Sequence, residues 1–130
     1  MNILLDTNAL VWLLDKQQPG HLGVQAKSLI RHARSVYVSP ISLVELRIKA
    51  MIGKLDIPED IQDDIAKSGI KICDFKMGAA IIVNEFPQLI RHDPFDRMLL
   101  AQAQSETMTF VTADKILLGL KLSFVVNALD

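Results

Sequence analysis

The chain has 130 residues, of which 14 are basic, 15 are acidic and half are hydrophobic, and its formal net charge is −1. This length predicts one domain, spanning residues 1–130, and the balanced charge excludes a strongly basic nucleic-acid-binding protein. The single cysteine excludes an internal disulfide and favours a reducing, cytoplasmic location. No apolar run approaches the ~18 residues that a membrane span requires, so no membrane association is expected.

Short β-prone runs alternate with amphipathic segments along the whole chain. The first half predicts, in order, a strand at 3–5, a helix at 9–14, a break at Pro19-Gly20, a helix at 25–34, a strand at 36–38, a helix from Ser42 to about 52 and a helix that begins at Pro58. The second half predicts a strand at 70–73, helices at 76–86 and 94–105, a strand at 110–112, a short helix opened by Asp114 and a strand at 123–126. This alternation predicts an α/β fold, in which helices cover both faces of a parallel sheet.

Four carboxylates, isolated from one another in the sequence, stand where strands end or helices begin. Asp6 directly follows the first predicted strand, and Asp114 follows the fourth. Glu45 and Asp96 lie in the first turns of two predicted helices that begin at the same edge of the sheet. Ligands bind beyond the carboxyl ends of parallel strands, so we expect the four side chains to converge there. Such a cluster predicts a site for a hard divalent cation.

Each acid also has a purely structural interpretation as a helix cap. Ser42 and Glu45 have the spacing of a capping box. Asp6, Asp93 and Asp114 each stand where a side chain could accept hydrogen bonds from the first turn of a helix. Capping and metal binding are compatible, so both interpretations stay open, with capping favoured for Asp93.

Electrostatics distinguishes the two interpretations. Carboxylates crowded within ~5 Å repel one another, and without a cation some would take up protons. A bound Mg²⁺ or Mn²⁺ would remove this repulsion and would polarise a phosphoryl oxygen. Oxygen ligands favour these ions over Zn²⁺, and the lone Cys73 and three scattered histidines show no competing ligand spacing.

Four motifs follow one another along the chain. They are LLDTNALVWLL at 4–14, SPISLVELRIKAMIGKL at 39–55, HDPFDRMLLAQA at 92–103 and FVTAD at 110–114. In this order they resemble the PIN-domain ribonucleases, and among these the VapC-like toxins of type II toxin–antitoxin pairs. The resemblance spans nearly the whole chain, and HDPFDR is its most specific piece.

The resemblance implies a three-layer α/β/α fold, with a five-stranded parallel sheet of order 3-2-1-4-5. It implies an endoribonuclease that hydrolyses RNA phosphodiester bonds with Mg²⁺, for which Mn²⁺ can substitute. It also implies a homodimer that a VapB-like antitoxin inhibits.

The resemblance further assigns roles to single residues. Asp6 and Asp96 would be the firmest metal ligands, Asp114 a second-metal or water-mediated ligand, and Glu45 a group that holds the metal or orients the attacking water. Asn8 would support Asp6, although closely similar members often have His at that position.

Other residues near the acids leave alternatives open. Arg97 and Lys49 could bind RNA phosphates, or they could be solvated charges or members of local ion pairs. His92 is either a surface residue or a side chain that approaches the site. Apolar residues on two helices, such as Trp12 and Ile48, fit core packing, an antitoxin groove or a dimer face.

A catalytically idle RNA- or protein-binding module on the same fold is the alternative function. Signalling receiver domains need paired acids after the first strand, and phosphatases with a D-x-D nucleophile need a second acid two residues after the first. Asp6-Thr7-Asn8 provides neither pattern. No glycine-rich phosphate-binding loop supports nucleotide binding.

Overall fold

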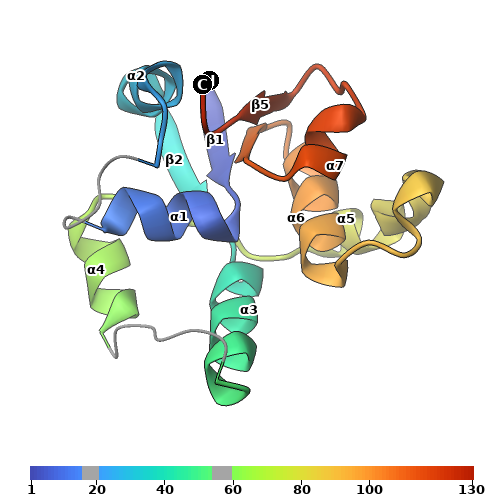
Figure 1. Cartoon of the computed structure of the whole chain (residues 1–130), viewed down its shortest axis with the longest axis horizontal. Coiled ribbons are helices and arrows are strands. Elements are labelled where there is room, and N and C mark those ends of the chain that lie inside the picture. Colours follow the sequence, from blue (N-terminus) through green and yellow to red (C-terminus); the bar gives the residue numbers. More distant parts are fainter. Residues whose placement is uncertain (16–20, 54–59) are drawn as a thin grey trace.

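The sheet is five-stranded and entirely parallel. Figure 1 shows the computed structural model, which describes residues 1–15, 21–53 and 60–130. The strands are β1 Asn2–Leu5, β2 Ser35–Val38, β3 Lys71–Ile72, β4 Thr109–Thr112 and β5 Val125–Asn127. They are arranged in the order β3-β2-β1-β4-β5. The predicted sheet and its order are therefore confirmed.

The helices fall between the strands along the chain. The α-helices are α1 Thr7–Leu14, α2 Val24–His32, α3 Pro40–Met51, α4 Ile61–Lys67, α5 Met77–Ile82, α6 Pro94–Ser105 and α7 Lys115–Gly119. The 3₁₀-helices η1 Val83–Glu85 and η2 Pro87–Leu89 lie between α5 and α6. Among the described residues, no helix combines the length and the apolar character needed to cross a bilayer.

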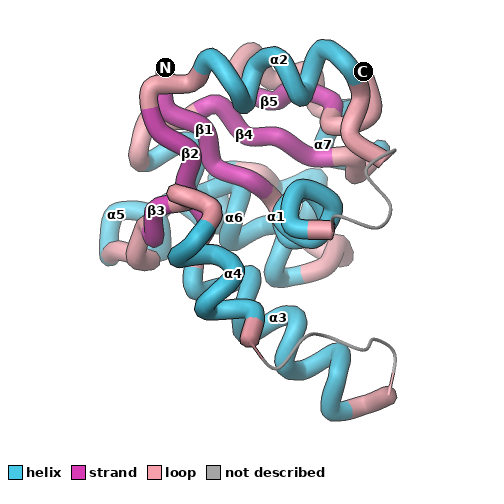
Figure 2. The backbone as a smooth tube through the Cα atoms, turned by 90° about the vertical axis from the view of Figure 1, so that its left-hand side faces the viewer, coloured by secondary structure: helices cyan, strands magenta, loops and turns pink. Residues whose placement is uncertain are grey.

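Alternating side chains of the central strand build two separate cores. Ile3 and Leu5 point to one face of the sheet, where they belong to the same buried cluster as residues of α1, α3 and α4. Leu4 points to the other face, into a cluster with residues of α6 and α7. This division follows from the two-residue period of a strand. Figure 2 shows helices on both sides of the strands, which confirms the three-layer fold.

Helix α3 begins earlier than predicted. Pro40 is its first residue, and the side chain of Ser39 caps it by accepting a hydrogen bond from the Ile41 N–H at 3.1 Å. Proline suits the first helical position because it has no N–H to leave unpaired. Ser42 therefore lies inside the helix, and the capping box that its spacing to Glu45 suggested does not form.

Other boundaries also differ from the predictions, two of them at α5 and β5. The helix expected over 76–86 is α-helical only from Met77 to Ile82 and continues as the 3₁₀-helix η1. Strand β5 begins at Val125 rather than at residue 123. The expected break at Pro19-Gly20 and the helix start at Pro58 lie outside the described residues.

The carboxyl ends of β1 and β4 lie side by side. Leu5 pairs with Val111, and the backbone N–H of Asp6 donates to the carbonyl of Val111 at 3.0 Å. The residues after these two strands therefore open onto one edge of the sheet. In Figure 1, α3 starts at this same edge and extends away from the sheet.

Candidate functional site

Asp6 joins the end of β1 to the start of α1. One carboxylate oxygen accepts the backbone N–H of Ala9 at 2.7 Å, so Asp6 is the N-cap of α1. The other accepts the hydroxyl of Thr112 at 2.6 Å, across the neighbouring strand. The residue is only 4% exposed. Asp6 thus has both the capping role and a fixed place at the sheet edge.

Asp114 occupies the corresponding position after β4. Its Oδ1 atom accepts the N–H groups of Ile116 and Leu117 at 2.9 and 3.0 Å, which makes it the N-cap of α7. Its own N–H donates to the Thr112 hydroxyl at 3.1 Å. Thr112, which the sequence analysis did not single out, therefore links the two acids, and the Oδ2 atom of Asp114 remains turned away from the helix cap.

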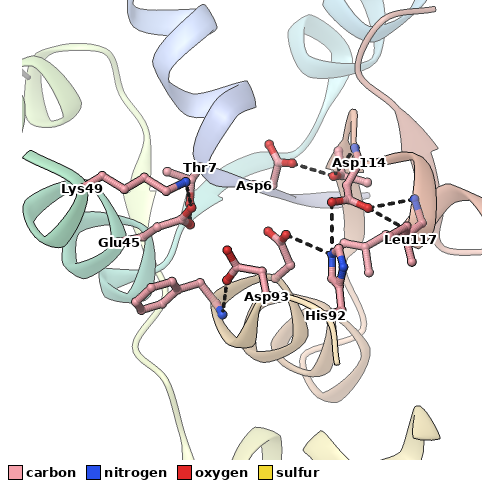
Figure 3. Close-up of polar contacts among 12 residues, drawn as sticks. Asp6, Thr7, Glu45, Lys49, His92, Asp93, Asp114 and Leu117 are labelled. Atoms are coloured by element: carbon pink, nitrogen blue, oxygen red, sulfur yellow. Dashed lines mark hydrogen bonds and ion pairs between the residues drawn. The ribbon is translucent and has the colours of Figure 1, made fainter. Parts of the chain in front are cut away.

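Glu45 is buried on α3, with 3% of its surface exposed. The Thr7 hydroxyl lies 2.6 Å from its Oε1 atom, and Lys49 forms an ion pair with its Oε2 atom at 2.5 Å (Figure 3). Lys49 is thus a member of a local ion pair, one of the alternatives left open. The Thr7 hydroxyl also lies 3.0 Å from the hydroxyl of Ser42. Because it has one proton, it donates to the carboxylate and accepts from Ser42.

Asp93 and Asp96 lie at the start of α6. Asp93 accepts the N–H of Phe95 at 2.8 Å and is the N-cap, as favoured from the sequence. Asp96 is in the first turn, and its Oδ2 atom lies 3.2 Å from Nε2 of His92. The same nitrogen lies 3.1 Å from Oδ2 of Asp114. His92 is therefore not a surface residue, since its side chain is only 13% exposed and contacts two of the four acids.

These elements enclose an acid-lined cavity of about 300 Å³. Its walls comprise Asp6, Thr7, Asn8, Trp12, Glu45, Lys49, Asp93, Asp96, Ala113 and Asp114. All four predicted acids are brought together, and the exposed Asn8 joins them at the wall. Arg97 does not line the cavity, and its Nε atom is buried without a hydrogen-bond partner among the described residues.

Burial and mutual repulsion disfavour the charged forms of two of these acids. The pKa of Asp6 is raised from 3.8 to about 6. Burial is the largest cause and the charge of Glu45 adds to it, while the hydrogen bonds from Thr112 and Ala9 act in the opposite direction. The pKa of Asp96 is raised to about 7, chiefly by burial and then by the nearby charges of Asp93, Glu45 and Asp114. The Lys49 pKa is raised by its hydrogen bond to Glu45.

The donor set fits a divalent cation. Buried carboxylates with pKa values raised towards neutral pH are stabilised in their charged form by a bound cation, and their oxygens are the ligands that Mg²⁺ and Mn²⁺ prefer. Among the described residues, one group of histidine and acidic side chains offers ligand atoms that all lie within 4.8 Å of one another. Its members are His92, Asp96 and Asp114. Asp6 and Glu45 lie outside this group, and their oxygens accept hydrogen bonds from Thr112 and Ala9 and from Thr7 and Lys49.

We expect Thr7→Val to lower the free energy of unfolding by about 1–3 kcal/mol, because it removes the hydrogen-bond partner that the Oε1 atom of Glu45 and the hydroxyl of Ser42 share. Urea unfolding in chelator measures this change. Thr109→Val is the matched control, since the Thr109 hydroxyl is near the surface, and it should change stability by less than about 0.5 kcal/mol. Equal losses in the two variants would show that the buried hydrogen bonds of Thr7 do not stabilise the site.

The chain combines a parallel sheet of this order, helices on both faces and an acid-lined cavity at the carboxyl edge. This combination defines a class of α/β protein suited to hold a divalent cation between separated carboxylates. Residues 3–120 match the family model of the PIN domain. The chain therefore belongs to the PIN domain family.

Several solved structures share the fold. The chain is similar to VapBC2 from Rickettsia felis, bound to a DNA fragment from its promoter, with a TM-score of 0.68, 20% identity and 98% of each chain covered. It is similar to DNA-bound VapBC from Salmonella typhimurium, with a TM-score of 0.67, 22% identity and 98% of each chain covered. VapC20 of Mycobacterium tuberculosis, a sarcin-ricin loop cleaving toxin, gives a TM-score of 0.59 at 15% identity, with 95% of this chain and 98% of that chain covered. No curated protein sequence matches the chain.

Proposed function

We propose that this PIN-domain protein is a metal-dependent endoribonuclease and the toxin of a VapBC-type toxin–antitoxin pair. The observation that carries the proposal is the convergence of four carboxylates, from four separate segments, on one cavity at the carboxyl edge of the sheet. A catalytically idle binding module has no need to bury such a set, because crowded carboxylates destabilise the folded state unless a cation offsets their repulsion.

Asp6, Asp96 and Asp114 would hold Mg²⁺ or Mn²⁺ in this cavity, with Glu45 nearby. When bound, the ion would polarise a phosphoryl oxygen of RNA and make water a better nucleophile. Glu45 is fixed by Thr7 and Lys49, so its carboxylate can accept a hydrogen bond from the attacking water without first reorganising. Asp93 holds the first turn of α6 in place and thereby positions Asp96.

The proposed inhibitor is a VapB-like antitoxin. The proteins of similar fold from Rickettsia felis and Salmonella typhimurium are VapBC complexes. In this chain an apolar groove of about 440 Å³ lies between α3 and α4, with Leu43, Leu46 and Ile65 among its walls. An amphipathic antitoxin segment would bury its apolar side chains there. A homodimer and a cytoplasmic location belong to the same proposal, and the buried free thiol of Cys73 fits a reducing compartment.

Cleavage of total cellular RNA by the purified protein tests the proposed activity. We expect discrete products with Mn²⁺ and none with EDTA, because the acids alone can neither polarise the phosphate nor activate water. Mapping the product ends would then identify the RNA. Cleavage that continues in EDTA would refute the metal-dependent mechanism, and absence of cleavage in a protein that binds Mn²⁺ and is free of antitoxin would favour the idle binding module.

A further inference from the structure

His92 contacts the acid site from the turn that precedes α6. Its Nε2 atom lies 3.1 Å from Oδ2 of Asp114 (Figure 3). The same atom lies 3.2 Å from Oδ2 of Asp96. The Asp114 oxygen is held in this direction because the other oxygen of the carboxylate caps α7. Three donor atoms from two segments of the chain therefore face one another.

One hydrogen bond does not account for both contacts of the imidazole. Whether the ring is neutral or charged, Nε2 carries at most one proton, so it can make one well-aligned hydrogen bond and not two. The spacing also matches another arrangement. In an octahedral ion with bonds of about 2.1 Å, neighbouring ligand atoms lie about 3.0 Å apart, close to the two distances from His92.

We infer that Nε2 of His92 is a ligand of the divalent cation, beside Asp96 and Asp114, and that this nitrogen makes the site select Mn²⁺ over Mg²⁺. The inference rests on the proposed metal-dependent function and adds a ligand that the acidic motifs do not contain. Imidazole binds first-row transition-metal ions, of which Mn²⁺ is the weakest binder, whereas Mg²⁺ prefers oxygen ligands and keeps its waters. Replacing one oxygen ligand by nitrogen therefore strengthens Mn²⁺ binding relative to Mg²⁺ binding.

Pulsed electron paramagnetic resonance of Mn²⁺ bound to the full chain tests the ligand directly. We expect an imidazole ¹⁴N modulation in the wild type, which becomes a ¹⁵N signal when only histidine is labelled with ¹⁵N. The signal should disappear in His92→Phe, which keeps a ring in the same space but removes the ligand. It should persist in His32→Phe and His21→Phe, which alter an exposed histidine on α2 and the histidine stacked on Trp12.

Metal titration provides a second measurement that does not depend on catalysis. His92→Phe should weaken Mn²⁺ binding by about tenfold or more, the scale seen when even an outer-shell partner of a metal site is lost, and should change Mg²⁺ binding much less. Mn²⁺ bound to the wild type without ¹⁴N modulation would overturn the ligand role and leave the four-acid site standing. Absence of Mn²⁺ binding by the wild type would overturn both this inference and the proposed metal-dependent function.

Discussion

Asp96→Asn is expected to reduce RNA cleavage by about a thousandfold or more while leaving the fold intact. The loss follows because the variant removes a carboxylate from the centre of the proposed metal site, and the metal supplies several kcal/mol of transition-state stabilisation. The same change should raise the melting temperature of the metal-free protein at pH 8. Burial and the charges of Asp93, Glu45 and Asp114 disfavour the ionised Asp96, and Asn has no charge to repel.

The opposite signs of the two effects make this variant informative. Cleavage is measured with Mn²⁺, and thermal unfolding is measured in EDTA. Asp63→Asn is the matched control, because Asp63 is an exposed aspartate in the first turn of α4 and its replacement should change neither quantity appreciably. Asp96→Asn with nearly full activity would remove Asp96 from the site, and a lower melting temperature in EDTA would show that its carboxylate stabilises the fold.

Much of the site follows from local sequence because strand ends and helix starts can be recognised over a few residues. Asp6 directly follows an apolar run, and Asp114 follows β4 at the start of α7, so a parallel sheet brings them together once β1 and β4 are neighbours. That neighbouring position came from the resemblance to the PIN family and not from periodicity. Capping and convergence proved compatible, since Asp6 and Asp114 each cap a helix while lining the same cavity.

The sequence missed the contacts that depend on packing between distant segments. The spacing of Ser42 and Glu45 suggested a local capping box, whereas both side chains meet Thr7, 35 and 38 residues away along the chain. His92 meets Asp114 across 22 residues. One local signal was present, because His92 and Asp96 are four residues apart at the start of a helix. That spacing alone does not show which side chains share one face.

The metal-free protein should lose stability as the pH rises from about 4 to about 8. Asp6 has a pKa of about 6 in the folded protein, above its usual 3.8, and the pKa of Asp96 is raised in the same way. Between the unfolded and folded pKa values the folded state binds more protons than the unfolded state, so the free energy of unfolding decreases with pH. The stabilisation is complete below about pH 4 and is lost as the pH passes the folded values.

A shift of about two pKa units at Asp6 corresponds to about 3 kcal/mol over the full titration. About 1.4 kcal/mol of this is lost between pH 5 and pH 8, which urea unfolding in EDTA at these two pH values can resolve. Other groups titrate over the same range, so the comparison that isolates Asp6 is the difference between the wild type and Asp6→Asn at each pH. The variant should lose less stability between the two pH values, because its side chain cannot ionise. Parallel profiles for the two proteins would contradict the raised pKa of Asp6.

Saturating Mn²⁺ at pH 8 should restore much of the lost stability in the wild type and little in Asp6→Asn. The ion binds the folded protein and favours the ionised carboxylate that folding alone disfavours.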